Sequence, residues 1–148
     1  MDQYIQTWSG SVNESSRLKS YSIFKTQFEH ERYLDVISHR TFRITLAKFR
    51  TSSHNLRIET GRHDGTAQND RICQNCRMNA IESEYHFLLV CPKYIHIRRK
   101  YFKPYYCHWP TQQKFNSLLN STSPRVLNNI AKFLFYAEKE RHLDNPLM

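Results

Sequence analysis

The stretch CQNCRMNAIESEYHFLLVC, residues 73–91, holds three of the four cysteines of the chain and one histidine. Cys73 and Cys76 are separated by two residues, so both thiols can approach one ion from a tight turn. His86 and Cys91 follow after nine and then four further residues. Three thiolates and one imidazole form the closed tetrahedral set that suits Zn2+. The spacing predicts one structural zinc ion per chain, without the open position that a hydrolytic zinc requires.

Other uses of these cysteines fit the sequence less well. A redox-active Cys-x2-Cys pair favours a strand–helix setting, whereas Gln74 and Asn75 are typical of a polar loop. Disulfides favour a secretory context, and the N-terminus lacks the basic and apolar segments of a signal peptide. The fourth ligand has alternatives, because further His and Cys residues follow the stretch. The substitutes are His96, Cys107 and His108.

Basic residues are concentrated on both sides of this stretch. The 148-residue chain has 22 Lys and Arg against 13 Asp and Glu, a formal net charge of +9. Acids are absent between Asp35 and Glu59, where five bases lie, and between Glu84 and Glu138, where eight bases lie. Such one-sign stretches attract polyanions, and phosphate neutralisation gives salt-dependent affinity. The pattern favours contact with nucleic acid over an ordinary solvated basic surface.

The candidate nucleic-acid contacts lie on an expected helix and around the metal stretch. They are Arg40, Arg43, Arg50, Arg71, Arg77, Lys93, Arg98, Arg99, Lys100 and Lys103. Aromatic residues interleave with the later bases, and unpaired bases of a single strand can stack on such rings. The alternative for any one ring is a place in the core. These rings are Tyr94, Tyr101, Phe102, Tyr105, Tyr106 and Trp109.

Apolar periodicity predicts a mainly α protein with about five to six helices around an irregular Cys3His zinc knuckle. The expected helices cover residues 16–29, a short piece around 33–37, 39–50, 81–90, 92–103 and 123–141. Residues 51–70 read as a loop with a short extended piece at 56–58, and residues 103–110 read as an aromatic connection.

The chain reads as one domain with two polar ends. We expect a lead-in over 1–14, a zinc-binding helical domain over 15–141 with its metal-binding centre at 70–103, and a tail over 142–148. No apolar run approaches the length of a membrane span, and a secretion signal is lacking, so we expect an intracellular protein, nuclear or cytoplasmic. Three glycines in the whole chain exclude a glycine-rich nucleotide loop, and we expect no small-molecule substrate.

Three segments together resemble the zinc-binding segment that follows the reverse transcriptase in many non-LTR retrotransposon polyproteins, the zinc-binding in reverse transcriptase family. They are Leu56–Arg62, Arg71–Cys76 and Ile81–Pro92. The likeness is close over 56–94 and loose over 15–140. In that family the segment is thought to grip template RNA or target DNA during target-primed reverse transcription.

The resemblance has implications for individual residues. It implies that the metal ligands are Cys73, Cys76, His86 and Cys91. It also implies that Glu82 and Glu84 are carboxylates that support the ligands or a helix N-terminus.

This chain lacks the Tyr-x-Asp-Asp motif of a polymerase and an acid cluster of a nuclease. We therefore expect a zinc-stabilised nucleic-acid-binding module that is not an enzyme. The alternative is a zinc-braced protein–protein interaction domain with a basic face. An enzyme with Glu82 or Glu84 as general base ranks third, because catalytic zinc keeps an open position. The sequence leaves open the choice of RNA or DNA, base specificity, oligomeric state, and whether the chain is a polyprotein fragment or a standalone gene product.

Overall fold

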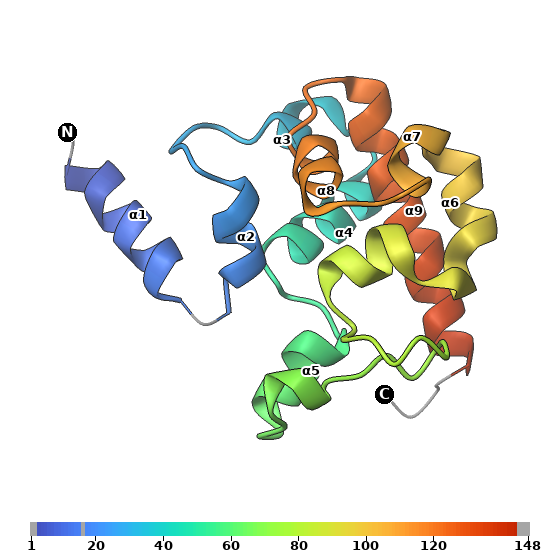
Figure 1. The fold of residues 1–148 in the computed structure, drawn as a ribbon. Helices are drawn as coiled ribbons and strands as arrows, with labels where there is room; N and C mark the ends of the chain where they lie inside the picture. Colours follow the sequence, from blue (N-terminus) through green and yellow to red (C-terminus); the bar gives the residue numbers. More distant parts are fainter. Residues whose placement is uncertain (1–2, 16, 145–148) are drawn as a thin grey trace.

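The computed structural model describes residues 3–15 and 17–144, and over these residues it contains helices and one isolated β-bridge but no strand (Figure 1). The mainly α prediction is confirmed, with more helices than expected. The α-helices are α1 (Gln3–Glu14), α2 (Lys19–Phe24), α3 (Arg32–Val36), α4 (Arg40–Arg50), α5 (Arg57–His63), α6 (Ile95–Tyr101), α7 (Pro104–Cys107), α8 (Gln112–Leu119) and α9 (Pro124–Asp144). The 3-10 helices η1 (Gln68–Asp70) and η3 (Pro92–Tyr94) and the π-helix η2 (His86–Val90) complete them.

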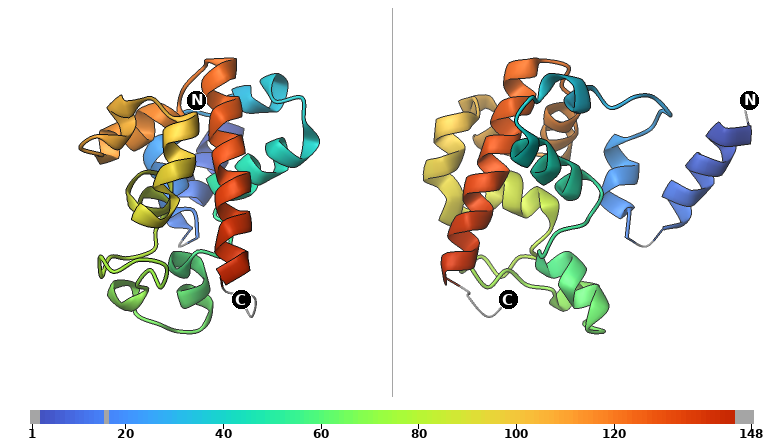
Figure 2. Two further views of the ribbon diagram at one scale, coloured as in Figure 1. Left: turned by 90° about the vertical axis from the view of Figure 1, so that its right-hand side faces the viewer. Right: turned by 180° about the vertical axis from the view of Figure 1, so that it is seen from behind.

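Helix α9 is the centre of the packing. It lies between α6 on one side and α4 on the other (Figure 2). Its buried apolar residues are Leu127, Ile130, Ala131, Phe133, Leu134 and Ala137. Phe87 of η2 packs against Phe133, with ring centroids 5.9 Å apart, and against Tyr94, at 4.9 Å. The segment that carries His86 and Cys91 is therefore anchored in the main core.

Several predicted helices are confirmed together with their end signals. Helix α4 buries Leu46 and Phe49, as the periodicity of residues 39–50 predicts. At the start of α9 the Ser123 hydroxyl accepts a hydrogen bond from the backbone N–H of Val126 at 3.4 Å. This is the expected N-cap, followed by Pro124 in the first turn.

The predicted helix over 16–29 is much shorter than expected. Helix α2 ends at Phe24, and Lys25 already has an extended backbone with φ −99° and ψ 94°. The Lys25 side chain is buried, with Nζ 3.1 Å from the Glu29 carbonyl oxygen and 3.6 Å from the Glu31 carboxylate. These contacts favour a folded-back loop over a continued helix. Phe28 is consequently 53% exposed rather than on a buried helix face.

Helix α5 lies where a loop was predicted. Glycine has low helix propensity, and Gly61 lies inside this helix. The side chain of Arg71 passes close to the Gly61 backbone. A Cβ at Gly61 would lie 2.5 Å from Cγ of Arg71, so this close approach requires glycine. Tertiary contact thus stabilises a helix that local sequence disfavours.

Helix α8 also was not predicted, although the sequence contains its signals. Thr111 caps the helix, because its hydroxyl accepts from the backbone N–H of Lys114 at 3.1 Å. Phe115, Leu118 and Leu119 form its buried face at helical spacing. The expected connection over 103–110 likewise contains the short helix α7.

The ends of the chain differ from the expected polar segments. Helix α1 occupies the predicted lead-in and extends away from the rest of the molecule, packing against α2 (Figure 2). Helix α9 continues to Asp144, so the predicted tail begins inside it. Residues 1–2, 16 and 145–148 lie outside the described part. Among the described helices, none combines the length and the apolar character needed to cross a membrane.

Candidate metal centre

A short hairpin presents the first two thiols. Ile72 and Ile81 form an antiparallel bridge, and the N–H of Cys73 donates to the Ala80 carbonyl at 2.8 Å. The hairpin returns through Asn79 at φ 54°, a left-handed backbone conformation that asparagine tolerates. Cys73 and Cys76 therefore lie on one tight turn, as their spacing predicts.

A π-turn brings the other two ligands together. In an α-helix, residues five apart point about 140° away from one another. Here the N–H of Cys91 donates to the carbonyl of His86 at 2.7 Å, which is the i to i+5 hydrogen bond of a π-helix. The wider turn returns Cys91 to the side of His86. The four-residue spacing between them is thus explained by η2.

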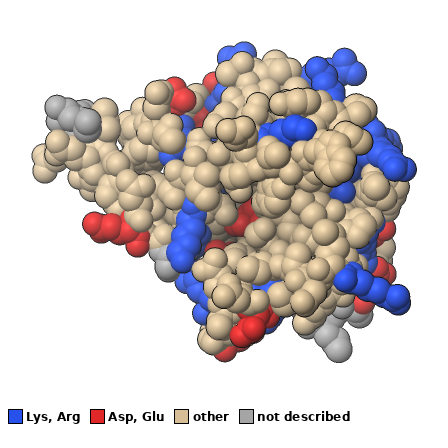
Figure 3. Space-filling view, viewed as in Figure 1, with Lys and Arg blue, Asp and Glu red and all other residues tan. Residues whose placement is uncertain are grey.

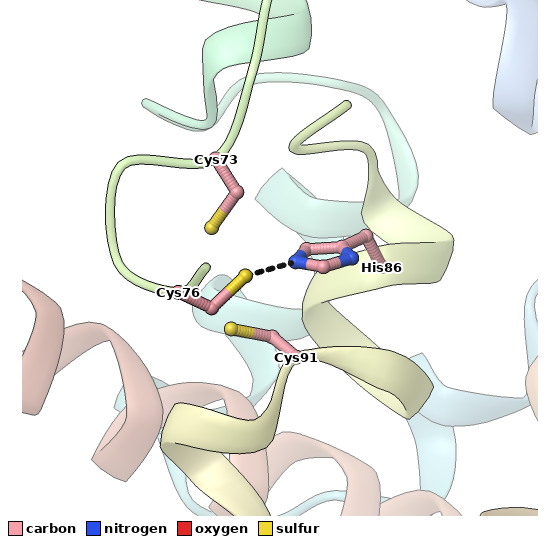
Figure 4. Close-up of side chains that lie close together, drawn as sticks. All are labelled: Cys73, Cys76, His86 and Cys91. Atoms are coloured by element: carbon pink, nitrogen blue, oxygen red, sulfur yellow. Dashed lines mark hydrogen bonds between the residues drawn. The ribbon is translucent and has the colours of Figure 1, made fainter. Parts of the chain in front are cut away.

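The four side chains converge on one point between the hairpin and η2 (Figure 4). Their ligand atoms all lie within 4.8 Å of one another, and Cys76 Sγ is 3.5 Å from His86 Nε2. A tetrahedral ion with ordinary Zn–S and Zn–N bonds requires sulfur–nitrogen separations of about 3.5 Å and sulfur–sulfur separations of about 3.8 Å. The predicted group Cys73, Cys76, His86 and Cys91 is therefore confirmed as a cluster that could hold a metal ion.

The proposed substitutes for the fourth ligand are not in this cluster. His96 instead faces Glu140, with Nε2 3.2 Å from the carboxylate. Cys107 and His108 belong to the end of α7. All four cysteines of the chain are free thiols in this structure.

The cluster is largely shielded from water, and its thiols shift one another's pKa values. Cys73, His86 and Cys91 are buried, and Cys76 is partly exposed. Hydrogen bonding to Cys91 together with burial raises the pKa of Cys73 to about 12. Burial raises the pKa of Cys76, whereas the hydrogen bond with Cys73 lowers the pKa of Cys91. Metal binding must displace thiol protons, so its affinity should fall as the pH is lowered.

Glu82 connects this cluster to two helices. It is 1% exposed, and its two carboxylate oxygens accept from Arg141 of α9 at 2.8 and 3.1 Å. The same carboxylate accepts from the backbone N–H of Arg57 at the start of α5, at 2.7 Å. It also accepts from Nδ2 of Asn75 at 3.1 Å and lies 3.8 Å from Sγ of Cys73. The supporting role that the resemblance implies for Glu82 thus has a definite geometry.

Glu84 anchors the start of the helical turn before His86. Its carboxylate accepts from the hydroxyls of Ser20 and Ser52 at 2.9 and 3.2 Å and lies 2.9 Å from Nε2 of His54. Nδ1 of His54 accepts from the N–H of Leu56, so the proton belongs on Nε2, facing Glu84. Burial alone would raise the pKa of Glu84, but the His54 hydrogen bond lowers it overall. Both glutamates are therefore occupied as structural carboxylates.

Two of the predicted nucleic-acid contacts are wrong, because their side chains are buried. Arg98 is 2% exposed and donates from Nε to the carbonyl of Leu88 at 2.8 Å and from Nη2 to that of Phe87 at 3.2 Å. Arg50 is 4% exposed and donates to the carbonyl of Leu119 at 2.7 Å. Both guanidinium groups satisfy backbone carbonyls inside the fold and cannot reach a phosphate.

The remaining candidate bases divide into two groups. Arg43, Arg71 and Lys93 are partly exposed but engaged, with the Ile37 carbonyl, the Thr66 and Ile58 carbonyls, and Asp144, respectively. Five are exposed and take part in none of the ion pairs among the described residues. These are Arg40, Arg77, Arg99, Lys100 and Lys103. Lys and Arg side chains gather on the right of Figure 3, over α6.

The predicted aromatic set also divides. Tyr94 is 0% exposed and Phe102 is buried, so these two rings belong to the core. Tyr101 and Tyr106 are partly exposed, and Tyr105 and Trp109 are 62% and 77% exposed. Core packing and surface exposure thus both occur within one short segment.

Replacing Arg98 with Met should destabilise the protein by about 2–3 kcal/mol, because the Leu88 and Phe87 carbonyls lose their buried donors. Urea unfolding of the metal-loaded protein measures this change. The matched control is Arg99→Met at the next, exposed position, where we expect a change within about 0.5 kcal/mol. Equal effects at both positions would contradict the bracing role of Arg98.

The fold and the cluster define the class of this protein: a small, mainly helical chain with one Cys3His group able to hold a metal ion. No protein-family model, curated protein or solved structure matches the chain. The resemblance to the retrotransposon zinc-binding segment therefore stays a prediction.

Proposed function

We propose that this protein is a zinc-stabilised, non-catalytic module that binds nucleic acid. The observation that carries the proposal is the position of the Cys3His cluster directly before α6, a helix with exposed cations. Arg99 and Lys100 lie on that helix, and Lys103 follows it. The metal would fix the direction of this basic surface through Cys91, which precedes η3 and α6.

Zinc is the ion that best suits the donor set. Three thiolates with one imidazole are soft and borderline donors, which disfavour Mg2+ and Ca2+. The four donors complete a tetrahedron, and such closed sites are structural. In this proposal the ion braces the hairpin against η2 and activates no water.

Absence of catalysis is part of the proposal. Glu82 and Glu84 are the carboxylates nearest in sequence to His86, and both are buried in hydrogen-bond networks with other protein groups. A general base needs access to a substrate proton. Their surroundings therefore support a structural role for them.

The resemblance to the segment that follows the reverse transcriptase of non-LTR retrotransposons agrees with this proposal. It suggests template RNA or target DNA as the polyanion. The two acid-free basic stretches supply the electrostatic part of such binding, which depends on phosphates rather than on sequence.

An apolar groove favours a second candidate function, a protein-interaction domain. The groove has a volume of about 800 Å3 and lies beside the hairpin and α6. Met78 and Ile95 contribute to it and are 51% and 42% exposed. Exposed apolar surface of this kind is typical of contacts with other proteins.

Fluorescence anisotropy with labelled single-stranded RNA and with duplex DNA, across a series of salt concentrations, tests the proposal. We expect binding at about 50 mM salt and a steep loss of affinity as salt increases. The double variant Arg99→Gln/Lys103→Gln should weaken binding and reduce the slope of log K against log salt for the single strand by about 1.4.

The matched control removes two exposed cations elsewhere, in the variant Lys19→Gln/Lys139→Gln, and should reduce the slope less. Absence of binding by the zinc-loaded protein at low salt, or an affinity that salt does not change, would contradict the proposal. Either result would favour the protein-interaction candidate.

A further inference from the structure

A pocket lies between the α6–α7 region and the start of α9. Its volume is about 310 Å3, the lower end of the range for small-molecule sites. Three cations and three aromatic rings dominate its lining. They are Lys100, Lys103 and Arg125, and Tyr101, Phe102 and Tyr106. The metal centre does not contribute to this pocket.

The charge of the pocket is of one sign. Among the described residues that line it there is no Asp or Glu, and its three cations form no ion pair in the described part of the chain. Ser123 and Arg125 also bring the N-terminus of the 21-residue helix α9 to the pocket. Its partial positive charge adds to that of the side chains. The pocket is therefore suited to an anionic group.

The rings of the pocket are held by the core. Tyr101 stacks on Tyr136 with centroids 6.1 Å apart and planes at 4°. Phe102 packs on Phe133 at 5.0 Å. Tyr106 is partly exposed and packs against the core. These side chains are already ordered by their packing. Stacking of a planar ligand on them would therefore cost little further side-chain entropy.

We propose that this pocket holds one nucleotide of a single strand. Lys100, Lys103 and Arg125 would bind its phosphate, and Tyr106 would contact its base. The inference rests on the proposed function and adds to it a preference for single-stranded nucleic acid over a duplex. A base in a duplex is paired and stacked between neighbours, so it cannot enter, whereas an unpaired base can.

The decisive variant is Tyr106→Leu, compared with Trp109→Leu at an exposed ring that does not line the pocket. The zinc-loaded full chain is titrated into fluorescein-labelled U12 RNA and into a 12-base-pair DNA duplex. Tyr106→Leu should lower the affinity for U12 about fivefold or more, because a stacked base is lost, and leave duplex affinity within about twofold. Trp109→Leu should leave both affinities within about twofold.

A second measurement identifies the ligand chemistry. Uridine 5′-monophosphate should displace U12 at concentrations where inorganic phosphate, at equal ionic strength, does not. If Tyr106→Leu does not fold, Arg125→Gln takes its place, since Arg125 is exposed. That variant should also weaken U12 binding more than duplex binding.

The failures are distinguishable. Two results would overturn the pocket while the proposed function stands. One is that the wild type binds U12 and the duplex but Tyr106→Leu and Trp109→Leu lose U12 affinity equally. The other is that phosphate and the mononucleotide displace U12 equally well. Lack of wild-type binding to either nucleic acid would overturn the proposed function itself.

Discussion

Chelation of the metal is expected to abolish the cooperative unfolding transition of the whole chain. The ion would join the hairpin with Cys73 and Cys76 to the π-turn with His86 and Cys91, and the same π-turn carries Phe87 in the main core. Structural zinc contributes apparent binding energies of about 10–16 kcal/mol, which matches or exceeds the usual stability of a domain, about 5–15 kcal/mol. Circular dichroism melts before and after treatment with EDTA measure the loss.

Two cysteine variants make this prediction specific. Cys76→Ser should lose the ion and the cooperative transition. Cys107→Ser, which removes a thiol outside the cluster, should retain both. Elemental analysis of the purified wild type should find one zinc per chain. A metal-free protein with an intact thermal transition would refute the structural role of the ion.

Replacement of Glu82 with Leu should destabilise the metal-loaded protein by about 3–5 kcal/mol. The change leaves the guanidinium of Arg141 buried, at 3% side-chain exposure, without its carboxylate. It also removes acceptors from the N–H of Arg57 and from the side chain of Asn75. Urea unfolding at saturating zinc gives the free energy of unfolding.

A double-variant cycle separates the ion pair from the other contacts of Glu82. Arg141→Leu alone should also cost about 3–5 kcal/mol, and the double variant should cost clearly less than the sum, because neither charge is then left alone. Asp35→Asn is the exposed control, since its pair with His30 is 58–65% exposed and should matter by less than about 1 kcal/mol. Additive losses at Glu82 and Arg141 would show that the pair is not coupled.

The metal cluster could be predicted because its geometry is local. Residues 73–91 contain all four donors, and zinc coordination restricts their spacing. Helices α4 and α9 could be predicted because their apolar residues recur at helical intervals. By contrast, α5 depends on Arg71 packing over Gly61 and on Glu82 at its N-terminus, contacts that local periodicity does not contain.

The error at the two buried arginines has a different cause. Arg50 and Arg98 lie in segments rich in basic residues, which suggest a solvent-exposed surface. In the structure, however, both lie on the buried face of their helices. Arg50 follows Leu46 by four positions, and Arg98 follows Tyr94 by four. Residues four apart lie on one face of a helix, so the sequence places both arginines on an apolar face. It does not show that the guanidinium groups are buried, because arginine on such a face can also extend its charged end to water.

The position of α9 near the end of the described residues has a consequence for folding during synthesis. Helix α9 packs on α3, α4 and α6, and Arg141 in its last turns completes the environment of Glu82. During synthesis all four metal ligands emerge from the ribosome well before residue 141 does. If the protein binds zinc as proposed, the nascent chain can therefore capture the ion, which would hold the hairpin and π-turn in place. The core can close only after α9 has emerged, because α3, α4 and α6 all pack on it.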